Sequence, residues 1–361
     1  MRVCGKDFIK KYLGAFKNRT NEKMEAPRKV WIFHHTDADG YCGGFLCKSY
    51  MKIFDFETYA CDYTTDFSRY DIEKNDVVMI VDLSFTDKTI YQLKDMAEKC
   101  NNRIMWIDHH ESSLDCYEND KELQDLDFLL LALGTRENRY SAAFIAFVVF
   151  SYIIYPKADD IKIPDYVYLV SDWDTWTHET KDSKYFNKGV NASPYIHLYS
   201  KDLERYDKHN IWEQLDEEFV RKIYTNSTLD ELINKGKLLV EENEVLDARY
   251  LKSNGFEFNL FGYSVLACNQ RSNSLLFGDK IDEYDFVCPF VLHRRNGKLI
   301  YTYSLFSTDD ELSCKELAER FGGGGHKGAA GFQLPFNIFT TKNLRLRLFL
   351  HNLKNKLSTK K

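Results

Sequence analysis

Two short segments of the chain, HTDADG at residues 35–40 and IDHH at residues 107–110, concentrate six side chains that can bind a divalent metal ion. These side chains are His35, Asp37, Asp39, Asp108, His109 and His110. Imidazoles and carboxylates that are held together without a cation repel one another or lie unpaired. Mixed ligands of this kind favour Mn²⁺, with Fe²⁺, Co²⁺ or Zn²⁺ as alternatives, whereas Mg²⁺ is a poorer partner for histidine.

Each segment follows an apolar run that predicts a buried strand, VWIF at residues 30–33 and IMWI at residues 104–107. A third run, VVMIV at residues 77–81, ends directly before Asp82. The carboxyl ends of parallel strands meet at one edge of a sheet, where α/β folds bind ligands. We therefore expect Asp82 to join the two segments at this edge. An acid after a strand is also a common helix cap, so a structural role is the alternative for each residue taken alone.

Two divalent ions at such an edge would support phosphoryl chemistry. A pair of ions roughly 3.5–4 Å apart activates a bridging hydroxide and neutralises a phosphoryl group during in-line displacement. This arrangement needs a bridging carboxylate, and Asp82 is the preferred candidate because it stands alone at the end of its strand. His35, Asp37 and Asp39 alternate along the chain, so an extended backbone would direct all three to one side.

A second candidate site is the glycine run at residues 322–325, which continues directly into His326 and Lys327. Glycines lack a Cβ atom, so their backbone N–H groups can approach an anion closely. His326 and Lys327 would add hydrogen-bond donors for a phosphate. A flexible linker is the alternative, but a linker rarely continues into a sequence such as HKGAAGF.

Strand-like runs alternate with helix-like segments over the first 200 residues, which predicts an α/β fold with a doubly wound, mainly parallel sheet. Strand patterns return at residues 262–268, 286–293 and 298–304, and Asn296-Gly297 is typical of a two-residue hairpin turn. We expect a smaller mixed α/β domain there. The expected boundaries are a basic leader at 1–29, a metal-binding catalytic domain at 30–200, a helical connection at 201–250 and a substrate-binding domain at 251–361.

The length of 361 residues is sufficient for two domains with their own cores. The net charge of −6 is no signature of nucleic-acid binding, but residues 342–361 carry seven Lys or Arg and no acid. This basic C-terminal helix could contact a nucleic acid, with a solvated helix face as the alternative.

Nine cysteines without a C-x-x-C pair, several of them in apolar runs, indicate reduced thiols. We find no apolar stretch that is long enough for a membrane span and no signal-peptide core at the N-terminus. The expectation is a cytoplasmic protein without a membrane partner, and a homodimer is left open.

The sequences HHTDADG, VDLS, IDHH, SDWD and FGGGGHKGAAGF together resemble the motifs of the DHH phosphoesterase superfamily. They follow the order of that superfamily from Val30 to Phe332, and the last resembles its DHH-associated C-terminal domain. Within the superfamily the chain is most similar to nanoRNase and oligoribonuclease members. The resemblance implies a manganese-dependent phosphodiesterase, a hydrolase with exonuclease activity that converts short RNA or linear dinucleotides to mononucleotides.

The resemblance also implies two bound manganese ions, with Co²⁺, Fe²⁺ or Mg²⁺ as alternatives. Their ligands would be His35 and Asp37 for one ion, Asp39, His109 and Asp172 for the other, and Asp82 as the bridge.

Three further residues would form the catalytic group by the same resemblance. Asp108 would orient the histidines, His110 would face the substrate phosphate, and His326 would contact that phosphate from the smaller domain. The substrate-binding residues would be Gly323, Gly324, Gly325, His326 and Lys327.

Three positions depart from the pattern of the superfamily. His34 competes with His35 as a ligand, and the spacing favours His35. Asp174 competes with Asp172, and Asp172 is preferred because it directly follows an apolar helix. Phe306 stands where many relatives carry an arginine that would contact the substrate, which leaves recognition of a second nucleotide open.

Other functions remain as alternatives. The same centre could act on phosphoadenosine phosphate or on cyclic dinucleotides, and a nucleotide sensor without catalysis is less favoured because Asp39, Asp82 and His109 are intact. The glycine-rich motif argues against an inorganic pyrophosphatase. Trp173, Trp176 or Phe306 could stack on a nucleobase, with burial in the core as the alternative for each.

Overall fold

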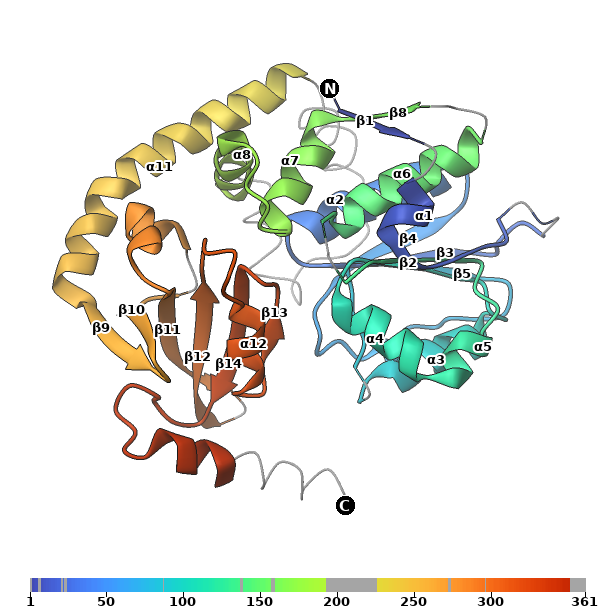
Figure 1. Cartoon of the computed structure of the whole chain (residues 1–361). Coiled ribbons are helices and arrows are strands. Elements are labelled where there is room, and N and C mark those ends of the chain that lie inside the picture. Colours follow the sequence, from blue (N-terminus) through green and yellow to red (C-terminus); the bar gives the residue numbers. More distant parts are fainter. Residues whose placement is uncertain are drawn as a thin grey trace. The chain divides into compact units, whose positions relative to one another are not determined.

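The computed structural model describes residues 2–5, 8–20, 22, 25–86, 88–136, 139–156, 160–192, 226–271, 274–295 and 297–350. The chain divides into two compact units, Met1–Lys237 and Leu238–Lys361. This division falls within the long helix α11 (Asn226–Asn254), drawn in yellow in Figure 1. The finer domain boundaries expected from the sequence stay predictions.

The first unit contains a six-stranded sheet in the order β2-β7-β6-β5-β3-β4 (Figure 1). Its strands are β2 (Leu13–Asn18), β3 (Val30–His35), β4 (Phe56–Cys61), β5 (Val77–Val81), β6 (Ile104–Asp108) and β7 (Leu130–Gly134). Neighbouring strands pair in parallel except at one edge, where β2 pairs antiparallel with β7. The predicted mainly parallel sheet is therefore confirmed.

Helices cover both faces of this sheet, as the doubly wound prediction requires. One core contains residues of α2 (Ala38–Met51), α6 (Ala142–Ile154), α7 (Asp165–Asp174) and α8 (Lys181–Asn191). The other contains residues of α3 (Ile90–Lys99), α4 (Glu111–Asn119) and α5 (Lys121–Asp125). Val30 and Ile32 of β3 pack into the first core, and Trp31 and Phe33 pack into the second. The central strands β5, β6 and β7 are buried on both faces, and they are almost entirely apolar for that reason.

Four shorter elements complete this unit. Strand β1 (Arg2–Gly5) pairs antiparallel with β8 (Asp160–Ile163), and the others are α1 (Phe8–Tyr12) and η1 (Phe67–Arg69). The segment expected to be a basic leader therefore contains β1, α1 and the edge strand β2.

The second unit contains a mixed sheet in the order β13-β14-β12-β11-β10-β9. Its strands are β9 (Gly255–Leu260), β10 (Tyr263–Asn269), β11 (Phe286–Arg295), β12 (Lys298–Phe306), β13 (Gly324–Gly325) and β14 (Ala329–Leu334). Only β10 and β11 pair in parallel among these described strands. A core of this unit contains residues of the sheet and of α12 (Cys314–Glu319), and η2 (Ser274–Glu283) follows β10. This confirms the predicted smaller mixed α/β domain.

The predicted hairpin joins β11 and β12. Arg295 lies opposite Lys298, as a two-residue loop requires, although Asn296 itself lies outside the described residues. None of the helices in the described part of the chain combines the length and the apolar composition that a membrane crossing requires.

Candidate metal centre

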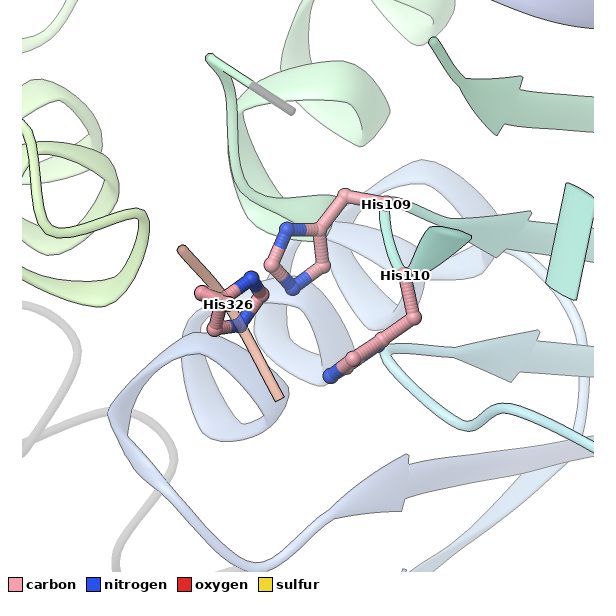
Figure 2. A group of neighbouring side chains, drawn as sticks. All are labelled: His109, His110 and His326. Carbon is pink, nitrogen blue, oxygen red and sulfur yellow. The ribbon is translucent and has the colours of Figure 1, made fainter. Parts of the chain in front are cut away.

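The three central strands of the first sheet bring the two predicted segments together. β6, β5 and β3 are neighbours and run parallel, so their carboxyl ends lie at one edge. His35 ends β3, Asp82 follows β5 and Asp108 ends β6. His109 and His110 follow at once, and Figure 2 shows their side chains leaving the chain at successive positions. The expectation that Asp82 lies between the two segments agrees with this arrangement.

Asp82 is a buried carboxylate that lies close to the imidazoles of His35, His109 and His110. It is 1% exposed, and its two carboxylate oxygens accept no hydrogen bond from the described part of the chain. Burial, together with the nearby carboxylates of Asp37 and Asp39, raises the pKa of Asp82 well above its ordinary value. A buried carboxylate without hydrogen bonds is costly unless a cation accompanies it.

The backbone of Asp82 is also unusual. Its φ angle is 57°, in the left-handed region that residues other than glycine rarely adopt. Its N–H donates to the carbonyl of Ile107 at 3.0 Å, which fixes this conformation beside β6. Such conformations concentrate at functional sites, where the surrounding structure must hold them.

One ligand group surrounds the Nε2 atom of His109. This atom lies 3.3 Å from Asp82 Oδ1, 3.3 Å from Asp174 Oδ2 and 3.9 Å from Asp39 Oδ2. Asp174 Oδ2 is buried and accepts no hydrogen bond from the described residues. Asp39, His109 and Asp174 therefore offer ligand atoms within 4.8 Å of one another. Three carboxylates around one imidazole fit a divalent cation.

A second ligand group consists of His35, Asp37 and Asp82. His35 Nδ1 lies 2.7 Å from Asp37 Oδ2 and 3.6 Å from Asp82 Oδ2. The other oxygen of Asp37 caps α2 by accepting a hydrogen bond from Gly40 N at 2.9 Å. Since Asp82 contacts both groups, its two oxygens are suited to a bridge between two ions.

The structure distinguishes His35 from its neighbour His34. His34 is 1% exposed, its ring centroid lies 5.0 Å from that of Tyr41, and its Nδ1 bonds the His35 carbonyl at 2.8 Å. Burial lowers the pKa of His34 to about 4, so the ring is neutral. His34 faces the inside of the protein, and the geometry favours His35 as the ligand, in agreement with the spacing.

The structure also distinguishes Asp174 from Asp172, the residue preferred in the sequence. The Asp172 carboxylate accepts hydrogen bonds from Thr177 Oγ1 at 2.8 Å, from Glu179 N at 2.7 Å and from Thr180 N at 3.3 Å. Asp172 thus closes the turn after α7. Side chains two positions apart on a helix point in different directions. Of the two carboxylates, Asp174 is the one that lies beside His109.

Asp39 links the metal centre to α6. Its Oδ2 accepts a hydrogen bond from Ala142 N at 2.8 Å, and its Oδ1 accepts one from Ala143 N at 3.0 Å. Anions are stabilised at the N-terminus of a helix, where backbone N–H groups are free to bond. Asp39 therefore belongs to α2, and its carboxylate is held by the N-terminus of α6.

Asp108 differs from the other carboxylates because its hydrogen bonds are complete. Oδ1 accepts from His109 N at 2.9 Å and from His110 Nδ1 at 2.8 Å, and Oδ2 accepts from the Ser113 hydroxyl. Although burial raises the pKa of Asp108, His110 and these hydrogen bonds hold it below its ordinary value. The carboxylate is hydrogen-bonded to the ring of His110, and the orienting role that the resemblance implies for it stays a prediction.

Tyr63 is a residue of this centre that none of the sequence motifs contains. Its ring centroid lies 5.0 Å from the ring of His35 and 6.5 Å from that of His110. β4 pairs with β3 so that Cys61 lies beside His35, and Tyr63 follows two residues later. Only the strand order brings Tyr63 to the centre, so the sequence carried no signal for it.

The predicted glycine run lies in the second unit. A Cβ atom at Gly323 would lie 2.1 Å from Gly331 O, and Gly325 has a φ of 141° and a backbone neighbour at 2.6 Å from its Cβ position. Close pairing with β14 therefore requires these glycines, whereas Gly324 has open space. The roles of all predicted substrate-binding residues, His326 and Lys327 included, toward the metal centre stay predictions.

The three aromatic residues proposed for base stacking occupy different surroundings. Trp173 and Trp176 have ring centroids 5.8 Å apart, and Trp176 has a φ of 58° in the turn closed by Asp172. Phe306 ends β12 and packs against a small core of the second unit.

No family model matches the chain. An uncharacterized protein of Acanthamoeba polyphaga mimivirus is 22% identical over 323 residues, which covers 84% of this chain and 66% of that protein. The chain thus spans just under two thirds of the length of this relative.

Several solved structures resemble the model at low sequence identity. The DHH domain of a member of the S1p family of ribosomal proteins has a TM-score of 0.50 and 14% identity, over 90% of this chain and 86% of that chain. The pGpG-specific phosphodiesterase PggH from Vibrio cholerae has a TM-score of 0.42 and 12% identity, over 86% of this chain and 93% of that chain. RecJ from Thermus thermophilus in complex with Mn²⁺ has a TM-score of 0.42 and 15% identity, over 90% of this chain and 52% of that chain.

The likeness to this DHH domain, together with the strand order, shows the fold of the chain. The chain has the fold of the DHH phosphoesterase superfamily, as its motifs predicted.

Proposed function

We propose that the protein is a metal-dependent phosphodiesterase that hydrolyses short oligoribonucleotides or linear dinucleotides to mononucleotides. The observation that carries this proposal is the buried Asp82 carboxylate, which accepts no hydrogen bond from the described residues and contacts both ligand groups. His35, Asp37 and Asp82 would hold one ion, and Asp39, His109 and Asp174 would hold the other with Asp82 shared. Mn²⁺ is the proposed ion because imidazole and carboxylate ligands are mixed, with Co²⁺, Fe²⁺ and Mg²⁺ as alternatives.

The two metal ions, when bound, would supply positive charge for the phosphoryl group and lower the pKa of a water nucleophile. The chain itself would orient the substrate. His110, whose ring is oriented by the hydrogen bond between its Nδ1 atom and Asp108, would contact a phosphoryl oxygen. The backbone N–H groups at Gly323 to Gly325 and the side chains of His326 and Lys327 would add donors to the same phosphate.

This function is tested by incubating the full chain with Mn²⁺ and a 5′-labelled RNA dinucleotide. Release of mononucleotide by the wild type and its loss in Asp82→Ala would support the proposal. The same reaction is run with RNAs of two to five nucleotides, cyclic dinucleotides and phosphoadenosine phosphate. Turnover of phosphoadenosine phosphate or of cyclic dinucleotides alone would overturn the proposed substrate, and nucleotide binding without any turnover would indicate a sensor.

The proposal extends to where and with what the protein acts. A cytoplasmic location, a homodimer and a nucleic-acid contact by the predicted basic C-terminal helix remain predictions, and residues 351–361 lie outside the described residues.

A further inference from the structure

Tyr63 presents an aromatic face at the metal centre. Its side chain is 50% exposed, and its ring lies 5.0 Å from the ring of His35 at an interplanar angle of 41°. It meets His110 edge-on, at 6.5 Å and 89°. Tyr63 therefore lies beside a proposed metal ligand on one side and beside the proposed phosphate contact on the other, while half of its surface is accessible.

A closed turn holds Tyr63 in this position. The Asp62 Oδ1 atom accepts hydrogen bonds from Thr64 N at 2.8 Å and from the Thr64 hydroxyl at 2.6 Å. Asp62 N donates to Thr65 Oγ1 at 3.0 Å, and Thr65 N donates to the Asp62 carbonyl at 3.0 Å. The backbone on both sides of Tyr63 is thus fixed before a ligand arrives, which lowers the entropic cost of binding.

What distinguishes Tyr63 from other exposed aromatic residues such as Tyr91 is its contact with two histidines of the candidate metal centre. A Tyr side chain that serves the core is buried, as Tyr303 is at 0% exposure. Aromatic rings beside a phosphate site are suited to nucleobases, because every base has a flat face that stacks on them. An inorganic phosphate or polyphosphate has no group that would use this ring.

We propose that Tyr63 is a substrate-binding residue that stacks on the nucleobase of the nucleotide whose phosphate is bound at the metal centre. This inference rests on the proposed function and deepens it, because it names the residue that would contact the nucleobase of the substrate.

The experiment measures binding of AMP and of inorganic phosphate to the Mn²⁺-loaded full chain by calorimetry. Tyr63→Leu, which keeps bulk but removes the aromatic face, should weaken AMP binding about tenfold or more and leave phosphate binding unchanged. Tyr63→Phe should retain the AMP affinity. Tyr91→Leu is the matched control, since Tyr91 is also exposed, at 64%, on α3.

A second readout uses fluorescence. In Tyr63→Trp, AMP should quench the new indole by stacking, whereas phosphate should not, and the wild type gives the background from its five native tryptophans. Mn²⁺ affinity and the thermal midpoint should be the same in all variants as in the wild type, because Tyr63 is not a ligand.

Three outcomes would overturn the inference. If Tyr63→Leu weakens the binding of AMP and of phosphate equally, Tyr63 shapes the site without recognising the base. Equal loss of AMP affinity in Tyr63→Phe and Tyr63→Leu would assign the contact to the hydroxyl rather than to the ring. Unchanged affinities in every variant would remove Tyr63 from the substrate site.

Failure of the catalytic proposal is distinguishable from these outcomes. If the wild type binds AMP through Tyr63 but cleaves no phosphodiester, the proposed catalysis fails and the nucleobase contact stands. If dinucleotides are cleaved and Tyr63→Leu leaves both affinities unchanged, the inference about Tyr63 fails alone.

Discussion

His109 Nε2 lies 3.3 Å from Asp174 Oδ2, although the two residues are 65 positions apart in the chain (174 − 109). This contact joins the end of α7 to the residue that follows β6. Because Asp82 and Asp39 approach the same nitrogen, the contact defines where one of the proposed metal ions would bind. It also assigns different roles to two carboxylates that the sequence left as alternatives.

The first prediction concerns these two carboxylates. Asp174→Asn should weaken Mn²⁺ binding by about 100-fold or more, because a charged ligand is replaced by a neutral one, whereas Asp172→Asn should leave Mn²⁺ affinity within a few-fold of the wild type. Asp172→Ala should instead lower the thermal midpoint, because Thr177, Glu179 and Thr180 lose their acceptor. Calorimetric titration with Mn²⁺ measures the affinity of each variant. A larger loss of affinity in Asp172→Asn than in Asp174→Asn would contradict the assignment of Asp174 as the ligand.

The second prediction concerns the stability of the metal-free protein. Asp82→Asn removes a buried carboxyl group that accepts no hydrogen bond from the described residues, so it should raise the thermal midpoint of the protein in EDTA. The wild type should gain about 2.7 kcal/mol of stability at a Mn²⁺ concentration of 100 times Kd, and the variant should gain far less. Differential scanning calorimetry with and without Mn²⁺ measures both effects. A destabilised metal-free variant would show that Asp82 has a stabilising partner.

The third prediction separates orientation from metal binding. Asp108→Asn should lower kcat by about 10–100-fold, because His110 loses a charged hydrogen-bond partner, while Mn²⁺ stoichiometry stays that of the wild type. Ser113→Ala removes only the hydroxyl that donates to the other oxygen and should have a smaller effect on kcat. Loss of bound metal in Asp108→Asn would assign the carboxylate to the ligand set instead.

The fourth prediction concerns pH and a buried ion pair outside the metal centre. Asp76 is fully buried and accepts hydrogen bonds from Arg28 and from the Trp31 indole at 2.8–2.9 Å. Burial raises the pKa of Asp76, but the bonds from Arg28, the backbone of Glu73 and Trp31 outweigh it and hold this pKa below its ordinary value.

A carboxyl whose pKa is lowered by folding contributes stability above the pKa of the unfolded state, about 3.9, and this stability is lost as the pH falls through the lower folded value. Urea unfolding of the wild type should therefore show a loss of stability below about pH 4 that is smaller in Asp76→Asn. Asp76→Ala should cost about 1–3 kcal/mol at neutral pH, since the Trp31 indole and the Glu73 N–H lose their acceptor. Identical pH profiles for the wild type and Asp76→Asn would refute the argument.

The sequence by itself determined the sheet and the position of its chemistry. Apolar runs such as residues 77–81 predict buried strands locally, and the carboxyl ends of parallel strands must meet at one edge. The gathering of His35, Asp82 and His109 followed from these two facts alone. The spacing also favoured His35 over His34, and burial of His34 agrees with that choice.

Only the tertiary structure shows that Asp174 lies beside His109 and that Tyr63 lies beside His35. The direction of a side chain on α7 depends on how that helix is rotated against the sheet, and no local pattern contains this angle. Likewise, Tyr63 lies beside His35 because β4 pairs with β3, and that pairing joins residues that are far apart in the chain. Local periodicity fixes which residues reach the edge of the sheet, whereas packing fixes which of them touch.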